Sequence, residues 1–250
     1  MSEIKVGVLG ARGRMGSESV RAIEAAEGLS LVAAIDHDDP IEQLLDAGAD
    51  VVVDFTSPSV VMDNLRFCLA NGIHAVVGTS GFDDARIAEV RELASASPDV
   101  GVLIVPNFSI GAVLMMRFAQ IAAPYYESVE VVELHHPDKV DAPSGTATRT
   151  AELIAEARAA AGTGPVPDAT TSDPLGARGA VVEGIHVHAV RARGLVAHQE
   201  VLFGDVGETL TIRHDSVHRE SFMPGVVAGV RGVGARPGVT VGLDAVLGLE

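Results

Sequence analysis

Short apolar runs alternate with longer amphipathic patterns from the N-terminus to Pro106. The amphipathic patterns predict helices at Met15–Ala26, Val60–Asn71 and Asp83–Ala94. The β-branched runs predict five strands: Ile4–Leu9, Leu31–Asp36, Val51–Phe55, His74–Val77 and Gly101–Val105. Strands that alternate with helices are typical of a parallel sheet. We therefore expect an α/β protein that begins with a Rossmann-like, doubly wound parallel-sheet domain.

The pattern changes after Pro106. A helix is predicted at Ile110–Ala123, ending at Pro124, and a second one at Ala147–Ala161. Alternating positions predict strands at Ser128–Leu134, Ile185–Arg193, Val196–Phe203 and Thr209–His214. This segment predicts an α+β domain with an open mixed sheet, half exposed to solvent. The Gly- and Pro-rich residues 162–178 predict a surface loop.

The last elements return to the α/β pattern. A helix is predicted at Met223–Gly232 and a strand at Val239–Leu243, and both are expected to rejoin the first sheet. The expected domains are thus residues 1–106 with 216–250, and residues 107–215.

Charge and composition narrow the class of protein. The chain of 250 residues carries 34 acidic and 18 basic side chains, a formal net charge of −16, which disfavours nucleic acid as a partner. No apolar run reaches the length of a membrane span, and the N-terminus does not read as a secretion signal, so we expect a cytoplasmic protein without a membrane partner. The single cysteine, Cys68, falls in an apolar helical pattern and cannot form an internal disulfide.

A glycine-rich segment follows the first predicted strand and opens the first helix. Gly10, Gly13 and Gly16 let the backbone approach a pyrophosphate, and the helix N-terminus favours its charge. Asp36, at the end of the second strand, can accept hydrogen bonds from ribose hydroxyls, or it is only a turn carboxylate. The loop also holds Arg12, Arg14 and Met15. Because the arginines offset the repulsion between Asp36 and a 2′-phosphate, both NADH and NADPH remain candidate cofactors.

Two further strand ends carry small and polar residues. They are Gly78, Thr79 and Ser80 after the fourth strand, and Pro106, Asn107 and Phe108 after the fifth. Ligands bind along the carboxyl edge of such sheets, so these residues are candidates for the cofactor site. Ordinary loop chemistry is the alternative.

A third constellation combines histidines, a lysine and a helix start. His135, His136 and Lys139 could supply a proton and positive charge. The helix that opens around Ser144, Gly145 and Thr146 could hold a carboxylate with its free N–H groups. The alternatives are surface histidines and a helix capped by Ser144 or Thr146. A metal site at His135 and His136 is disfavoured, because neighbouring side chains on an extended chain point to opposite faces; we expect no metal.

Together these residues resemble the 4-hydroxy-tetrahydrodipicolinate reductases, formerly dihydrodipicolinate reductases, of bacterial diaminopimelate and lysine synthesis. The matching pieces lie in the family's order along the chain: Val6–Gly16, Asp54–Thr56, Gly78–Gly81, Pro106–Ser109 and Glu133–Ala147. The last is the most specific. Residues 187–214 also resemble the sheet of the family's substrate domain.

The resemblance implies an NAD(P)H-dependent enzyme that reduces a small, cyclic imine dicarboxylate. It implies that His135 is the proton donor, with Lys139 beside it in the catalytic group. It also implies that His136, Lys139, Ser144, Gly145 and Thr146 bind the substrate, and that the three loops named above and Asp36 bind the cofactor. The first domain would bind the dinucleotide, and residues 107–215 would bind the substrate and form a homo-oligomer, a tetramer in the family.

Two departures and two rival functions remain. His37 follows Asp36 where some members have a basic residue, which puts strong NADPH selectivity in doubt, and Ser80 stands where threonine is common.

One rival function is that of another amino-acid or hydroxy-acid dehydrogenase, in which Lys139 and His135 would activate a carbonyl. The other is a non-catalytic nicotinamide sensor, for which the chain lacks a basic, DNA-reading patch.

Overall fold

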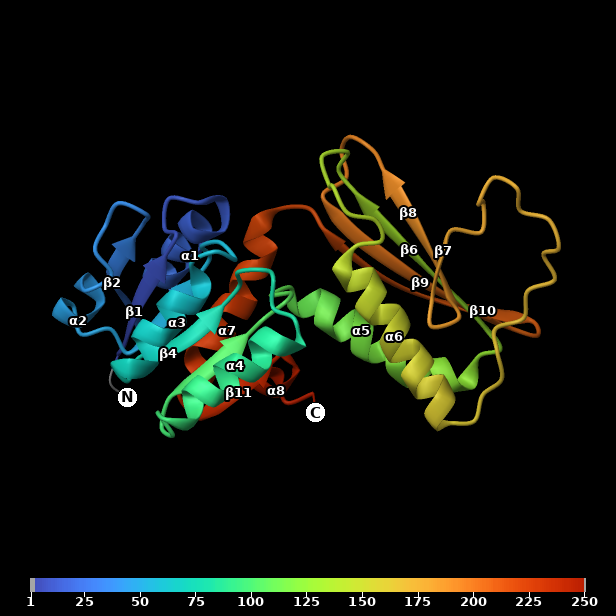
Figure 1. Cartoon of the computed structure of the whole chain (residues 1–250). Helices are drawn as coiled ribbons and strands as arrows, with labels where there is room; N and C mark the ends of the chain where they lie inside the picture. The colour runs from blue at the N-terminus through green and yellow to red at the C-terminus, as the bar shows by residue number, and fades with distance from the viewer. Residues whose placement is uncertain (1–2, 250) are drawn as a thin grey trace. The chain divides into compact units, whose positions relative to one another are not determined.

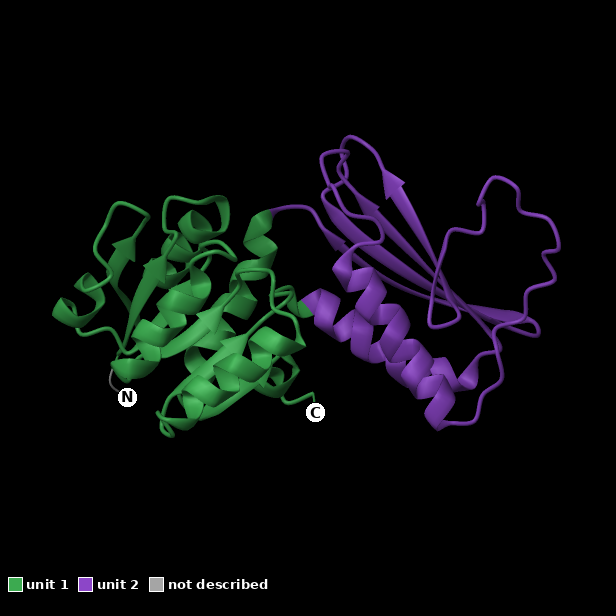
Figure 2. Ribbon diagram, in the orientation of Figure 1, with its two compact units in different colours: residues 1–110, 219–250 green, residues 111–218 purple. Residues whose placement is uncertain are grey.

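The computed structural model describes residues 3–249 in two compact units. Unit 1 comprises residues 1–110 and 219–250, and unit 2 comprises residues 111–218 (Figure 2). Residues 1, 2 and 250, which belong to the domains expected from the sequence, lie outside the described part. The chain therefore leaves unit 1 once, builds unit 2, and returns for its last two α-helices and its last strand.

Unit 1 is built on a six-stranded sheet in the order β11-β5-β4-β3-β1-β2. All neighbours run parallel, which confirms the Rossmann-like class expected from the sequence. The strands are β1 (Ile4–Leu9), β2 (Leu29–Ile35), β3 (Val51–Asp54), β4 (His74–Val77), β5 (Gly101–Ile104) and β11 (Gly238–Val241). Chain order reverses on either side of β1, so loops on both sides can meet at its carboxyl end.

Helices cover both faces of this sheet (Figure 1). They are α1 (Arg14–Ala25), α2 (Gln43–Asp46), α3 (Val61–Ala70), α4 (Asp84–Ser95), α7 (Met223–Val233) and α8 (Asp244–Leu247), with a 3-10 turn at Arg219–Phe222. Alternate residues of one strand serve opposite faces. Val77 packs with α3 and α4, whereas Val76 lies against Gly229 of α7.

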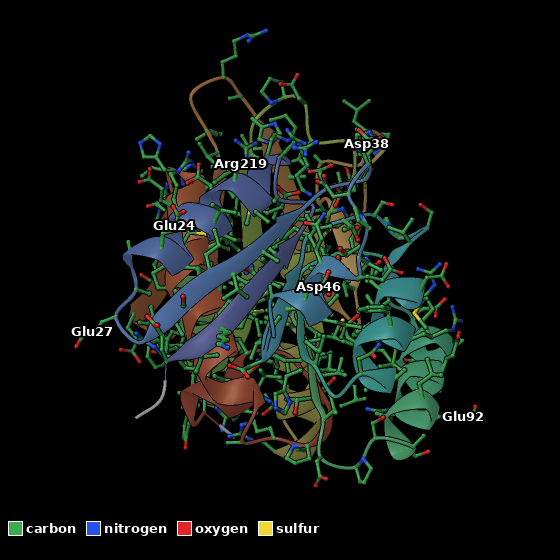
Figure 3. All side chains as sticks on the ribbon, turned by 90° about the vertical axis from the view of Figure 1, so that its left-hand side faces the viewer. Glu24, Glu27, Asp38, Asp46, Glu92 and Arg219 are labelled. Atoms are coloured by element: carbon green, nitrogen blue, oxygen red, sulfur yellow. The ribbon has the colours of Figure 1, made fainter. Side chains whose placement is uncertain are left out.

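The carboxyl ends of these strands form one edge of the sheet. Figure 3 shows this for β2: Glu27 precedes the strand and Asp38 follows it, and the two lie at opposite ends of the ribbon. Cys68 lies in α3, as expected, with 1% of its surface exposed. Burial raises the pKa of its thiol to about 12, so the thiol has a packing role.

Unit 2 holds a five-stranded sheet in the order β10-β9-β6-β8-β7. Its strands are β6 (Ser128–His135), β7 (Ala180–Val182), β8 (Ile185–Arg191), β9 (Ala197–Asp205) and β10 (Glu208–Ser216). Among the described strands of this second sheet, only β6 and β8 pair in parallel, so the sheet is mixed, as predicted.

One face of this second sheet carries the core. Helices α5 (Ile110–Ala122) and α6 (Gly145–Ala160) pack there against Val131, Val187 and Phe203, and a 3-10 turn (Ala123–Tyr125) follows α5 (Figure 1). The opposite face, which we call the outer face, presents Glu130, Val132 and Leu134 of β6, His186, His188 and Val190 of β8, and Glu200 and Leu202 of β9. It mixes apolar and charged side chains.

The structure differs from the predicted elements in detail. The sequence did not predict the short helices α2 and α8 or the three-residue strand β7. These elements are too short to show a periodic pattern. The loop at 162–178 contains no helix or strand, as predicted, but it is anchored: Arg178 donates to Asp168 at 3.1 Å and pairs with Glu130 at 2.5 Å. No helix among residues 3–249 is long and apolar enough to cross a membrane.

Candidate active site

The glycine loop between β1 and α1 is fixed by backbone contacts. Gly10 has φ of +76°, a conformation that favours glycine, and a Cβ there would lie 2.6 Å from the Phe55 carbonyl oxygen. A Cβ on Gly16 would lie 2.0 Å from the Gly10 oxygen, so only glycine lets α1 approach the loop this closely. Gly13 precedes α1 as its N-cap, and neither a capping side chain nor an acidic residue occupies the first turn. This helix start is suited to an anion.

Asp36 organises the turn after β2. Its carboxylate accepts hydrogen bonds from the backbone N–H of Arg12 at 2.8 Å and of His37 at 2.9 Å, and from the His37 ring at 3.0 Å. These contacts, the His37 side chain first, lower the pKa of Asp36 to about 2. The guanidinium of Arg12 pairs with Asp39 at 2.9 Å. Asp36 is thus a turn carboxylate and also part of the glycine loop's support.

A cavity of about 460 Å³ opens at this edge of unit 1. It is lined by the ends of β1, β2 and β3 and by the start of α3: Leu9, Gly10, Gly13, Ile35, Asp36, His37, Asp39, Ile41, Phe55, Thr56, Ser57, Val60 and Asn64. Three predicted cofactor residues, Gly10, Gly13 and Asp36, therefore share one cavity. Arg12 and Arg14 are exposed on the same loop, and Met15 is partly buried at the first turn of α1.

The other predicted cofactor loops follow β4 and β5. A Cβ on Gly78 would lie 2.1 Å from the Phe55 ring and 2.7 Å from the Phe108 ring, so glycine lets these aromatic rings meet there. Their centroids are 5.5 Å apart. Thr79 is buried and donates to Asp54 at 2.8 Å, whereas Ser80 and Pro106 are exposed. Asn107 is partly buried and accepts from the backbone of Ser109 at 2.8 Å.

In unit 2, His135 is the last residue of β6, and its side chain meets a buried carboxylate. Its Nδ1 lies 2.5 Å from Oε2 of Glu133, whose side chain is fully buried. The two residues share a face because side chains alternate along a strand. Burial, the largest influence, lowers the pKa of His135, and Glu133 partly opposes it.

Glu133 is shared by three elements. It accepts from both terminal nitrogens of Arg191, at 2.7 and 2.8 Å, and from the backbone N–H of Ser144 at 3.1 Å. Burial alone would raise the pKa of Glu133, but the hydrogen bonds from Arg191 and His135 outweigh it, and the net shift is downward. The carboxylate is therefore ionised near neutral pH.

The polar loop between β6 and α6 places the other candidates. Lys139 Nζ lies 2.6 Å from Oδ1 of Asp141, and the Asp141 carbonyl accepts from Arg191 at 2.8 Å. The Lys139 backbone N–H donates to the carbonyl of His136 at 3.2 Å. Lys139 is thus held on a loop that Arg191 fastens to β8.

Helix α6 begins within this site. Ser144 is the N-cap, and its Oγ accepts from the backbone N–H of Ala147 at 3.2 Å. The alternative that Ser144 caps the helix is therefore correct. Space is open around Gly145, where an added Cβ meets nothing within 4 Å, and Thr146 follows in the first turn. Backbone N–H groups there can face an anion.

The structure thus brings His135, Lys139 and the start of α6 to one end of the second sheet. Sequence reasoning assigned no role to Glu133 or Arg191. The alternation along β6 could have paired Glu133 with His135, but the partner from β8 needs knowledge of the parallel register, in which His135 lies opposite Arg191. Among residues 3–249, no three His, Cys, Asp or Glu side chains gather in a way that could hold a metal ion.

Comparison with known proteins agrees with this geometry. The family model for the dihydrodipicolinate reductase N-terminus matches residues 4–108, and the model for its C-terminus matches residues 111–247. The 4-hydroxy-tetrahydrodipicolinate reductase of Streptomyces coelicolor is 64% identical over the whole of both chains. The enzyme of the same name from Thermobifida fusca is 66% identical over 98% of this chain and all of its own.

Solved structures give the same result. The dipicolinate-bound dihydrodipicolinate reductase from Paenisporosarcina sp. TG-14 superposes with a TM-score of 0.87 at 39% identity, over 97% of this chain and 99% of that chain. An amine dehydrogenase from Mycobacterium smegmatis, at 16% identity and a TM-score of 0.61 over 96% and 95% of the chains, shares the fold alone. The resemblance expected from the sequence is confirmed. The chain belongs to the dihydrodipicolinate reductase family and is an oxidoreductase.

Proposed function

We propose that the chain catalyses the NAD(P)H-dependent reduction of 4-hydroxy-tetrahydrodipicolinate to tetrahydrodipicolinate, in the diaminopimelate route to lysine. Relatives that are 64% identical over the full length are named for this activity. The observation on this chain that supports it best is that Glu133 accepts from both His135 and Ser144, the two ends of the polar loop. One carboxylate thereby holds an acid group and a carboxylate-binding helix start together.

Residues 1–106 and 216–250 are proposed as the dinucleotide-binding domain. The cavity beside Gly10, Gly13 and Asp36 and the uncapped start of α1 fit a dinucleotide. The pyrophosphate would lie on Gly10–Gly16, and Asp36 would accept from the adenine ribose. Gly78, Thr79, Ser80, Pro106, Asn107 and Phe108 would hold the nicotinamide part, where Phe55 and Phe108 make an aromatic pair.

Either NADH or NADPH is proposed as the cofactor. Asp36 is ionised and repels a 2′-phosphate, but Arg12 and His37 contact the same turn, and Arg14 stands at the start of α1 after the glycine loop. The hydrogen bond to Asp36 raises the pKa of His37, which increases its positive charge near neutral pH. The turn thus offers a carboxylate for a ribose diol and cations for a phosphate.

Residues 107–215 are proposed as the substrate domain. The ammonium of Lys139, the ring of His136 and the N-terminal turn of α6, with Ser144, Gly145 and Thr146, would bind the two carboxylates of a cyclic imine dicarboxylate. The neighbouring Asp141 holds the Lys139 ammonium through an ion pair of 2.6 Å.

The 4-hydroxyl group of the substrate must leave as water, which gives a conjugated cyclic imine. Bound reduced nicotinamide would supply a hydride to that imine. The chain supplies the proton: His135, as the imidazolium, would donate it to the carbon of the substrate that gains electron density, and would then be reprotonated from water. Glu133 holds the ring through Nδ1 during both steps, which leaves Nε2 for the transfer. Lys139 would stabilise the charge that develops beside it.

A homotetramer and a cytoplasmic location are proposed as well. No helix of unit 2 covers the outer face of its sheet, where Val190 and Leu202 are 38% and 37% exposed. A second copy could bury this face. A reducing compartment suits the single unpaired cysteine and a reduced nicotinamide cofactor.

The test is a nicotinamide oxidation assay with the purified chain. Freshly generated 4-hydroxy-tetrahydrodipicolinate should be reduced with either NADH or NADPH, whereas simple keto acids should give turnover lower by orders of magnitude. Equal turnover of a keto acid would instead support a general hydroxy-acid or amino-acid dehydrogenase, and the proposal would be abandoned.

A further inference from the structure

Glu133 is unusual among the carboxylates of unit 2 because it is completely buried and still fully paired. Its side chain is 0% exposed and accepts four hydrogen bonds, from His135, Ser144 and both terminal nitrogens of Arg191. A buried charge is retained only where partners and hydrogen bonds compensate its desolvation. These contacts reach three separate parts of the site, on β6, β8 and the start of α6.

The contact to His135 determines which ring nitrogen carries a proton. An ionised carboxylate only accepts hydrogen bonds. The Nδ1 atom, 2.5 Å from Oε2 of Glu133, must therefore carry the hydrogen. When the ring is neutral, Nε2 is then the unprotonated nitrogen. When the ring is charged, Nε2–H is the donor that remains available to a substrate.

Arg191 and Glu133 have opposite electrostatic effects on His135: Glu133 raises the pKa of the ring, and Arg191 lowers it. Arg191 neutralises Glu133 through both carboxylate oxygens, and its own charge disfavours the imidazolium. The charged groups around His135 are Glu133 on β6, Arg191 on β8 and, on the loop, Lys139 with its partner Asp141. On β9, the neutral residues Ala197 and Gln199 lie opposite His135 and Glu133. Helix α6 contributes Thr150, which accepts a hydrogen bond from Gln199.

We propose that Glu133 and Arg191 are positioning residues for the reduction. They fix the tautomer and the orientation of the His135 ring, and their opposite charges together set the proton affinity of that ring. The inference rests on the proposed role of His135 as proton donor. Neither residue touches the reacting atoms; both act through the histidine.

Arg191 has a second contact that a simple counter-ion would not need. Its Nη2 donates to the carbonyl of Asp141 at 2.8 Å, and the Asp141 carboxylate holds Lys139. Moving Arg191 therefore disturbs the acid and the loop that carries the lysine together. A lysine at this position would keep the charge but lose the two parallel contacts to Glu133.

The pH dependence of turnover separates a positioning role from a structural one. A rate that needs protonated His135 falls as pH rises through its pKa. Glu133→Gln removes the negative charge, so the falling limb should move to lower pH by roughly one to two units. Arg191→Gln removes a positive charge, so the same limb should move to higher pH by roughly one unit. Loss of structural integrity alone would not shift the limb in opposite directions.

A direct measurement on the histidine covers the case in which a variant is too slow to assay. Nitrogen NMR of the histidine-labelled full chain reports the tautomer and titration of His135 without turnover. Wild type should show hydrogen on Nδ1, Glu133→Gln should lose that preference, and Arg191→Lys should titrate closer to wild type than Arg191→Gln. Because breaking a buried pair destabilises a protein, circular dichroism first checks folding.

Glu130→Gln is the matched control. Glu130 also lies on β6 and pairs with an arginine and a histidine, Arg178 and His188, but on the outer face. It should leave the tautomer and titration of His135 unchanged. If both charge variants titrate like wild type while His135→Gln is inactive, the positioning role is wrong. If His135→Gln keeps full turnover, the proposed proton donor fails first, and this inference falls with it.

Discussion

The carboxylate of Asp36 accepts a hydrogen bond from the backbone N–H of Arg12, 2.8 Å away, and so ties the turn after β2 to the glycine loop after β1. The Arg12 guanidinium reaches back to Asp39 of the same turn. A ligand that contacts one of these loops therefore contacts a support of the other. The contact explains why a carboxylate can stand beside a loop that is proposed to bind phosphate. Hydrogen bonds within the protein already compensate part of the negative charge of Asp36.

Replacement of Asp36 should change the choice of cofactor. Asp36→Asn keeps the size and an acceptor oxygen but removes the charge, so binding of NADPH relative to NADH should improve by roughly ten-fold. Calorimetric dissociation constants for both cofactors check this. Asp50→Asn is the control, because Asp50 also accepts from a backbone N–H, that of Lys5, but precedes β3 at the other edge of the sheet. An unaltered NADH/NADPH ratio in Asp36→Asn would place the ribose elsewhere.

The close approach of α1 to the loop should make Gly16 intolerant of any side chain. A Cβ there would lie 2.0 Å from the Gly10 oxygen, so Gly16→Ala must displace backbone and should cost about 1–3 kcal/mol of stability. Because the displaced loop is the proposed pyrophosphate site, cofactor affinity should fall as well. Gly164→Ala, where a Cβ meets nothing within 4 Å, should melt like wild type. A wild-type melting temperature for Gly16→Ala would contradict this prediction, because it would show that the loop can move to accommodate the methyl group at no cost in stability.

The elements of both sheets were predictable because their signal is local. The buried run Val51–Asp54 and the alternation along β6 reflect the surroundings of each strand, and the structure reproduces them. The four-residue helix α2 and the three-residue strand β7 are shorter than the periods that reveal helices and strands. Boundaries moved by a residue or two, as at α6, which begins at Gly145 instead of Ala147, because Ser144 is its N-cap.

The chemistry of the site was only half visible in the sequence. His135, His136 and Lys139 stand close together along the chain and carry the resemblance to the family. Glu133, which orients His135, is two positions away, but its partner Arg191 is far along the chain from both. Arg191 is 56 positions after His135 and meets Glu133 only because β6 and β8 pair in parallel. Long-range pairing of strands is what a single sequence does not specify.

Removal of the proposed proton donor should affect turnover more than binding. His135→Gln preserves a polar side chain of similar reach but cannot donate a proton, so kcat should fall by roughly 10²–10⁴-fold. Dissociation constants for NADH and NADPH should stay near wild type, because the cofactor cavity lies among residues of unit 1. Steady-state kinetics and cofactor titration measure the two effects separately. Full turnover by His135→Gln would mean that water or Lys139 supplies the proton.

The ion pair between Lys139 and Asp141 should set the affinity for dicarboxylates. Lys139 Nζ lies 2.6 Å from the Asp141 carboxylate, which competes with any substrate carboxylate for the same ammonium. Charge-assisted hydrogen bonds contribute about 1.5–3 kcal/mol, so Lys139→Ala should weaken pyridine-2,6-dicarboxylate, measured by calorimetry with cofactor present, by roughly ten- to a hundred-fold.

Two matched variants separate the lysine's charge from its loop. Asp141→Asn removes the competitor but keeps the backbone carbonyl that Arg191 uses, so the dicarboxylate should bind at least as tightly as to wild type. Thr146→Val should lose less than Lys139→Ala, because it removes one hydroxyl and leaves the backbone N–H groups of α6 in place. If Lys139→Ala binds the dicarboxylate as wild type does, or if the compound competes with NADH instead of substrate, the substrate site formed by Lys139 and the start of α6 has been placed wrongly.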